Sequence, residues 1–231
     1  EYLYRNPVSG IPRIINYYED GNQLIVIEEY ISGTSLQEKI DNSDLSVCDI
    51  RSYMIMLCNI LEALHSMTPP IIHRDIKPSN IIITSYNYAM LLDFNAAKQF
   101  SGQHESDTVL IGTPGYAAPE QYGFGSSSPK TDIYSLGIVL REMLGSITPA
   151  PDIAPILHRL NMIADRCTQM TPAARYQSVA ELKNAVSQSY YPAQHSTSAA
   201  GNSSQYAYQN HDNAANADTA KRDIHDSASR F

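Results

Sequence analysis

The sequence predicts an α+β fold in which a small β-sheet portion comes first, a mostly helical body follows, and a disordered tail ends the chain. Three observations favour this class. Short β-rich runs lie within residues 14–27 and 81–92, apolar residues recur at helical spacing in later segments, and large apolar residues nearly vanish from residue 188 onward. With 231 residues, 43% of them hydrophobic, the chain can form one large domain with its own core.

The first two β-rich runs cover residues 14–18 and 24–27 and are joined by Asp20-Gly21-Asn22. An Asp-Gly step between two such runs is typical of a hairpin turn. We therefore expect an antiparallel hairpin near the start of the chain.

A long amphipathic helix is predicted after Ser46-Val47-Cys48-Asp49, which has the form of a capping box. Its apolar positions are separated by four and three residues: Ile50, Met54, Leu57, Leu61 and Leu64. Thr68-Pro69-Pro70 should end this helix, and residues 81–83 and 89–92 predict two short strands around a turn.

A second buried helix is expected after the Gly- and Ser-rich stretch 112–128, with Ile133, Leu136, Leu140 and Leu144 on its apolar face. Helical patterns also appear at 153–170 and 176–187. Residues 188–231 contain too little apolar surface to offset the entropy of ordering, so this segment is predicted to be a disordered tail or linker.

Composition excludes several classes of protein. The net charge is −8 with a pI near 5.3, which argues against a nonspecific nucleic-acid binder, because such proteins need a surplus of Lys and Arg. No apolar run approaches the ~20 residues of a membrane span. Three widely separated cysteines, Cys48, Cys58 and Cys167, support neither a disulfide framework nor a zinc site. A reducing cytoplasmic location is expected.

Two segments carry the candidate chemistry: residues 73–80, which read His-Arg-Asp-Ile-Lys-Pro-Ser-Asn, and Asp93-Phe94-Asn95. Taken singly, the acids at 75 and 93 could be a turn residue and a strand-end cap. Phosphoryl transfer, however, needs a carboxylate to orient the attacking hydroxyl, a cation near the moving phosphate and oxygen ligands for Mg²⁺. The set that supplies these groups is Asp75, Lys77, Asn80 and Asp93.

These motifs resemble the H-R-D-x-x-x-x-N and D-F-G signatures of eukaryotic-type (Hanks-type) serine/threonine protein kinases. Their exact residues look most like those of bacterial members of the family. The resemblance implies a protein-kinase-like fold and a transfer of the ATP γ-phosphate to protein Ser or Thr hydroxyls. It divides the chain into an N-lobe remnant at 1–30 (the end of helix C, the hairpin and the start of the hinge), a mainly helical C-lobe at 31–187, and the tail at 188–231.

By this resemblance Asp75 is the catalytic base, Lys77 contacts the transferred phosphate, and Asn80 and Asp93 hold Mg²⁺. Lys77 together with Thr113 before Pro114 is the pattern of kinases specific for serine and threonine. The implied partners are a protein substrate with a Ser or Thr acceptor, and ATP.

The resemblance also implies an adenine site in which Glu29-Tyr30-Ile31 forms the hinge and Ile82 lies beneath the ring. The ATP-binding residues are then Glu29, Ile31, Lys77, Ile82 and Asp93. Glu28 falls at the back of that pocket, where burial would require a partner or a raised pKa.

Four supporting features have counterparts in the family. Ala118-Pro119-Glu120 resembles the end of an activation segment, and Glu120 should pair with Arg175. Asp132 should anchor the backbone of the catalytic loop, while His73 and Phe94 should pack together. Arg74 permits activation by a loop phosphate, for which the candidate acceptors are Ser101, Ser106, Thr108 and Thr113.

The sequence departs from the family in two respects. The Gly-rich loop, the β3 lysine and the helix-C glutamate have no counterparts, so we expect a chain truncated at its start that binds ATP weakly or not at all; a membrane anchor in missing parts is compatible with this. Asn95 replaces the glycine that permits φ > 0, a mild change because Asn tolerates the left-handed region.

Two alternatives come from other classes. A pseudokinase scaffold would need none of Asp75, Lys77, Asn80 and Asp93 at these spacings. A small-molecule kinase of the aminoglycoside or choline type shares an Asp…Asn…Asp core but lacks a long activation segment ending in Ala-Pro-Glu, which this chain has.

Overall fold

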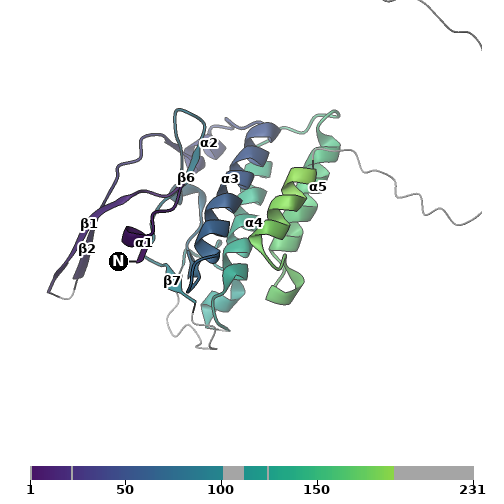
Figure 1. Cartoon of the computed structure of the whole chain (residues 1–231). Coiled ribbons are helices and arrows are strands. Elements are labelled where there is room, and N and C mark those ends of the chain that lie inside the picture. The colour runs from purple at the N-terminus through teal and green to yellow at the C-terminus, as the bar shows by residue number, and fades with distance from the viewer. Residues whose placement is uncertain (1, 22, 101–111, 124, 190–231) are drawn as a thin grey trace, which may run out of the picture. The chain divides into compact units, whose positions relative to one another are not determined.

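The computed structural model describes residues 2–21, 23–100, 112–123 and 125–189. A short helix, α1 (Tyr2–Arg5), precedes the antiparallel hairpin of β1 (Ile14–Asp20) and β2 (Gln23–Glu28), seen in Figure 1. The predicted hairpin is confirmed, and its turn lies where the Asp-Gly step predicts it, because Asp20 is paired with Gln23.

A three-stranded sheet of order β3-β5-β6 positions the candidate catalytic residues. Its strands are β3 (Thr34–Ser35), β5 (Ile81–Ile83) and β6 (Ala89–Leu91), all antiparallel to their neighbours. The last two confirm the predicted strand pair. Gly33 lets the first strand approach closely, since a Cβ there would lie 2.3 Å from the carbonyl oxygen of Ile83.

Several short elements were not predicted, because runs of two to six residues show no measurable periodicity. They are the helix α2 (Leu36–Asp41), the strand pair β4 (Ile71–Ile72) and β7 (Lys98–Gln99), and the 3₁₀ turns η1 (Pro78–Asn80), η2 (Pro119–Tyr122) and η3 (Pro172–Ala174).

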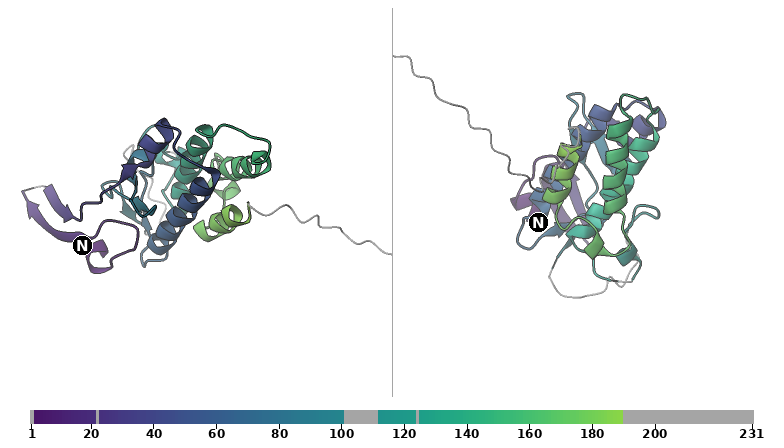
Figure 2. Two further views of the ribbon diagram at one scale, coloured as in Figure 1. Left: turned by 90° about the horizontal axis from the view of Figure 1, so that it is seen from above. Right: turned by 90° about the vertical axis from the view of Figure 1, so that its right-hand side faces the viewer.

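The helical body consists of α3 (Val47–His65), α4 (Pro129–Gly145), α5 (Ala154–Cys167) and α6 (Val179–Gln188), which pack side by side in Figure 2. The predicted capping box at the start of α3 is present: the Ser46 hydroxyl accepts from the Asp49 N–H, and the Asp49 carboxylate accepts from the Ser46 N–H. The predicted apolar residues of α3 are all fully buried in the core. Gly137 allows α4 and α5 to pack closely, because a Cβ there would lie 2.4 Å from the Cβ of Cys167.

The folded part extends slightly further than the sequence indicates. Gln188, assigned above to the tail, is the last residue of α6, and Ser189 is buried with its hydroxyl donating to the Val186 carbonyl. The rest of the predicted tail, 190–231, lies outside the described residues. None of the helices in the described part of the chain is long and apolar enough to cross a membrane.

Candidate active site

The loop at 73–80 is joined to the end of β6 by the pairing of β5 with β6. Ile81 is opposite Leu91, and one residue further the Leu92 N–H donates to the Asn80 carbonyl at 2.8 Å. This register places Asn80 beside Asp93. The two short strands thus bring Asn80 and Asp93 to one cavity.

The Asp75 carboxylate accepts hydrogen bonds from three neighbouring residues. Oδ1 accepts from the backbone N–H and the hydroxyl of Thr113, at 2.9 and 2.7 Å. Oδ2 lies 3.0 Å from Lys77 Nζ and 3.2 Å from Asn80 Nδ2. Partial burial alone raises the pKa of the Asp75 carboxyl, but the hydrogen bonds from Thr113 and Lys77 outweigh burial and lower the pKa. Asp75 is therefore a carboxylate at neutral pH.

Lys77 links the loop to the activation segment. Its Nζ also donates to the Thr113 hydroxyl at 2.7 Å, so Asp75, Lys77 and Thr113 form one hydrogen-bonded group although 36 residues separate the lysine from the threonine. In the sequence, only the family resemblance linked Thr113 to Lys77.

Asn80 and Asp93 line a cavity of about 410 Å³. Asn80 Nδ2 donates to the Asp75 carbonyl at 3.0 Å as well as to the Asp75 carboxylate, so the amide oxygen Oδ1 is the atom that could bind a metal. One amide oxygen and one carboxylate fit Mg²⁺, which usually takes one or two protein oxygens and completes its shell with phosphate and water. Within the described residues, no group of three or more His, Cys, Asp or Glu side chains could hold a metal.

The turn after β6 differs from the expectation for Asn95. The residue with positive φ is Asp93 (φ 64), while Asn95 is not in the left-handed region. The Asn95 N–H donates to Asp93 Oδ1 at 3.2 Å, so the aspartate side chain closes the turn. Asp is one of the few residues that adopt this conformation at low cost, which explains why position 95 needs no glycine here.

Glu28 shares this cavity with Asp93 and has an exposed side chain, so its expected burial behind an adenine pocket is wrong for this structure. Two effects raise the pKa of the Glu28 carboxyl. The larger is partial desolvation, and the smaller is repulsion from the Asp93 carboxylate.

Asp132, on α4, is fully buried and holds the catalytic loop by its backbone, as expected. Its Oδ2 accepts from the His73 N–H and its Oδ1 from the Arg74 N–H, both at 2.9 Å. His65 Nε2, at 2.8 Å from Oδ2, is a third partner. Sequence reasoning missed His65, whose only signal is its position in the last turn of α3. Burial raises the pKa of the Asp132 carboxyl, but the bond from His65 and nearby charge lower it overall.

We predict that Asp132→Asn lowers the free energy of unfolding by about 1.5–3 kcal/mol, because the neutral amide cannot replace a carboxylate that accepts three hydrogen bonds in the core. Urea denaturation of both proteins measures this difference. Asp165→Asn is the matched control, since the exposed Asp165 carboxylate pairs with Arg141 at the surface. Equal losses in the two variants would contradict the anchoring role of Asp132.

His73 and Phe94 pack edge to face with ring centroids 4.7 Å apart, which confirms their expected contact. His73 Nδ1 accepts from the Asp75 N–H at 3.3 Å, so Nε2 carries the proton and donates to the Leu92 carbonyl at 3.1 Å. Burial lowers the pKa of His73, and the nearby carboxylates only partly oppose this.

This lowered pKa predicts that stability falls in mild acid. The unfolded chain binds a proton at His73 more readily than the folded chain, so stability decreases as pH falls from the ordinary value of 6.5 toward the lowered folded-state pKa. The limiting slope is about 1.4 kcal/mol per pH unit. Urea unfolding at several pH values from 7.5 to 5 should show a shallower slope for His73→Phe. His158→Gln, at an exposed position, should keep the wild-type slope; an unchanged slope in His73→Phe would refute the assignment.

Arg74 precedes Asp75 and was expected to pair with a phosphate on the activation segment. Arg74 has φ 69, is buried, and donates from Nε to the Ala96 carbonyl at 2.6 Å. The candidate phosphate acceptors Ser101, Ser106 and Thr108 lie outside the described residues. Thr113, the fourth candidate, is bonded to Asp75 through its hydroxyl.

The expected pair of Glu120 and Arg175 is confirmed. Arg175 is 1% exposed and binds the carboxylate with both terminal nitrogens, at 2.8 and 2.9 Å. The Thr131 hydroxyl donates to the same carboxylate at 2.9 Å. This pair fastens the end of the activation segment to the helical body.

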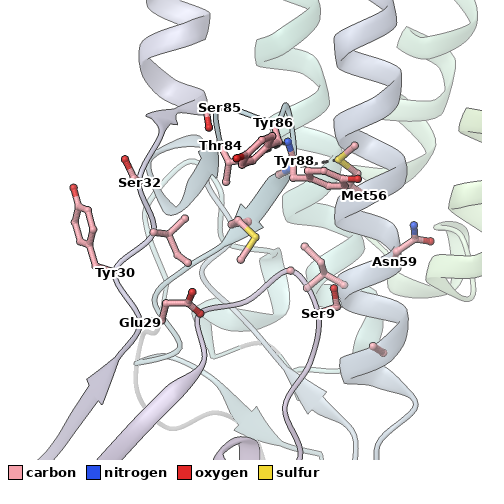
Figure 3. A pocket seen from close by; sticks show the side chains of 16 residues that line it. Ser9, Glu29, Tyr30, Ser32, Met56, Asn59, Thr84, Ser85, Tyr86 and Tyr88 are labelled. Atoms are coloured by element: carbon pink, nitrogen blue, oxygen red, sulfur yellow. Dashed lines mark hydrogen bonds between the residues drawn. The ribbon is translucent and has the colours of Figure 1, made fainter.

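The residues assigned to the adenine ring do not line the cavity that contains Asp93. Glu29 and Ile31 line a separate cavity of about 730 Å³ that Figure 3 shows, and neither Asn80 nor Asp93 lines it. Ile82, in the middle of β5, is half-buried. The adenine assignments of Glu29, Ile31 and Ile82 therefore stay predictions.

Comparison with known proteins finds similarity to protein kinases. A family profile described as "Protein kinase domain" matches residues 3–209. A putative leucine-rich repeat receptor-like serine/threonine-protein kinase of Arabidopsis thaliana is 32% identical over 190 residues, which are 79% of this chain and 21% of that protein. Serine/threonine-protein kinase D of Synechocystis sp. is 30% identical over 199 residues, 77% of this chain and 38% of that protein. The chain thus spans well under half the length of these relatives.

Proposed function

This chain belongs to the protein kinase domain family, and we propose that the protein of which it forms the kinase portion transfers the ATP γ-phosphate to Ser or Thr hydroxyls of a protein substrate. The observation that carries the proposal is the bonded group of Asp75, Lys77, Asn80 and Thr113 next to Asp93. These groups match the needs of phosphoryl transfer in charge and type.

In this mechanism Asp75 orients the attacking hydroxyl and accepts its proton, for which its lowered pKa keeps the carboxylate ionised. Lys77 would move from Asp75 and Thr113 to the transferred phosphate, because its partly exposed amine lies next to the proposed base. Bound Mg²⁺ would neutralise phosphate charge, and Asn80 and Asp93 would hold it through their oxygens.

Three further observations support the proposed acceptor residues, the type of partner and the cellular location. The bond between Lys77 and Thr113 supports Ser/Thr acceptors, and the matched relatives carry serine/threonine-protein kinase in their names. The net charge of −8 supports a partner other than nucleic acid. Free thiols at Cys58 and Cys167, both buried, support a reducing cytoplasmic location.

The test is Mg²⁺-dependent stabilisation by ATP, measured in a form of the protein that shows kinase activity. A nucleotide present at 100 times its dissociation constant should add about 2.7 kcal/mol to the unfolding free energy, seen as a raised melting temperature. We expect Asp93→Ala to lose this shift, because the metal oxygen is removed. Asp152→Ala, at an exposed position, should keep it. An equal shift in Asp93→Ala and wild type would contradict the metal-binding role.

A further inference from the structure

The cavity of about 730 Å³ lies apart from the proposed catalytic group. Its wall is formed by α3, the β5–β6 turn, residues 9–10 and the chain that follows β2, as Figure 3 shows. Neither Asp75 nor Lys77 lines it. A volume of this size accommodates a drug-sized molecule or a few side chains of a peptide.

The interior of the cavity is apolar and its rim is aromatic. The apolar part is contributed by Ile31, Met56, Ile60 and Met90. On the rim, Tyr86 and Tyr88 are 84% and 61% exposed. Exposed aromatic side chains around an apolar hollow are typical of protein-interaction sites, where tyrosine often supplies much of the binding energy.

The cavity also contains a weakly satisfied strand edge. In the β5–β6 ladder Met90 is opposite Ile82, while the N–H groups of Ala89 and Leu91 point to the outer edge of β6. The Leu91 N–H donates to the Gly10 carbonyl at 2.8 Å. The Ala89 N–H donates instead to the Met56 sulfur at 3.4 Å, the dashed line in Figure 3.

A thioether sulfur is a weak acceptor, and methionine is flexible. A carbonyl oxygen brought to this edge would therefore replace Met56 as the partner of the Ala89 N–H. The Gly10 carbonyl already accepts from the Leu91 N–H at this edge, and the new oxygen would accept from the next outward-pointing N–H, that of Ala89. This geometry favours an extended peptide over a compact small molecule.

The charge of the cavity selects among peptides. Among its lining residues, all of which the structure describes, Glu29 is the single charged side chain. Its carboxylate accepts a long hydrogen bond, 3.4 Å, from the Arg13 backbone N–H. An acid with so weak a contact at the mouth of an apolar cavity favours a basic group on the ligand.

We propose that this cavity binds an extended peptide segment of a partner protein. The segment pairs with the β6 edge at Ala89, inserts one apolar side chain between Ile60 and Met90, and places a Lys or Arg beside Glu29. This is recognition by strand addition, in which main-chain bonds give affinity and the pocket gives specificity. It does not depend on phosphate transfer.

The test uses the full 231-residue chain and a hexapeptide library with Arg fixed at one end, Leu fixed at a central position and β-branched residues elsewhere. Binding is followed by fluorescence polarisation and by amide shifts of the ¹⁵N-labelled protein. We expect saturable binding with a shifted Ala89 amide, and weaker binding by about tenfold when Glu replaces Arg in the library.

Two variants separate the parts of the proposal. Asn59→Arg puts a cation on the exposed cavity wall and should weaken binding by about tenfold. Met162→Arg, at another exposed helical site that lies outside the cavity, should not. Ala89→Pro removes the edge N–H without touching the β5 ladder and should also weaken binding. No Ala89 shift at millimolar library, or equal binding by Asn59→Arg and Met162→Arg, would overturn the proposal.

Discussion

Asp75→Asn is expected to lower kcat by about 10²- to 10⁴-fold, the contribution of a positioned general base. Asparagine keeps the size of the side chain and can still accept from Thr113, but it cannot take the proton of the substrate hydroxyl. The measurement is transfer of labelled γ-phosphate to a serine-containing protein, made in a form of the protein that shows this activity.

The control for this prediction is folding. Asp75→Asn should retain a cooperative melting transition, since the amide has nearly the same size and can still accept the hydrogen bonds from Thr113. Asp165→Asn, an exposed acid on α5, should keep full turnover. Wild-type turnover in Asp75→Asn would refute the catalytic assignment, whatever the behaviour of the metal-binding residues.

Arg175→Ala should cause the largest loss of stability, about 3–5 kcal/mol, because it leaves the Glu120 carboxylate buried without its cation. Arg175 also donates to the carbonyls of Lys130, Gln169 and Met170, so the substitution also removes three hydrogen bonds to backbone carbonyls. For a domain of this size the melting temperature should fall by roughly 6–20 °C.

Arg166→Ala is the matched control. Arg166 pairs with Glu181 at the surface, with the two side chains 47% and 39% exposed, and such pairs contribute about 0–1 kcal/mol. The Arg175→Ala melting curve should therefore lie far below that of Arg166→Ala. Coincident curves would show that the pair of Glu120 and Arg175 does not hold the activation segment.

Much of the architecture could be predicted because its elements are long and locally encoded. The capping box at Ser46 and the periodic apolar residues of α3 specify a helix without any tertiary information. The Asp-Gly step likewise specifies the hairpin. Two-residue strands such as β4 and β7 could not be predicted, because their only determinant is a partner distant in sequence.

The sequence singled out residues that the structure brings together, but it did not indicate the hydrogen bonds between them. Motif spacing singled out Asp75, Lys77, Asn80 and Asp93, yet nothing local indicates that Asn80 turns its amide nitrogen toward Asp75 and leaves its oxygen for a metal. The expectation of a positive φ at Asn95 was wrong, because the positive φ lies two residues earlier at Asp93, whose side chain closes the turn.

The order of residues by itself determined the long helices and the hairpin and singled out the side chains proposed to handle phosphate, since these depend on periodicity, caps and motif spacing along the chain. Only the folded structure decided that His65 shares Asp132 with the catalytic loop, that Glu28 is exposed beside Asp93, and that Ala89 faces a cavity with a sulfur as its acceptor. These are contacts between distant segments, and their energies depend on distance and burial that no local pattern contains.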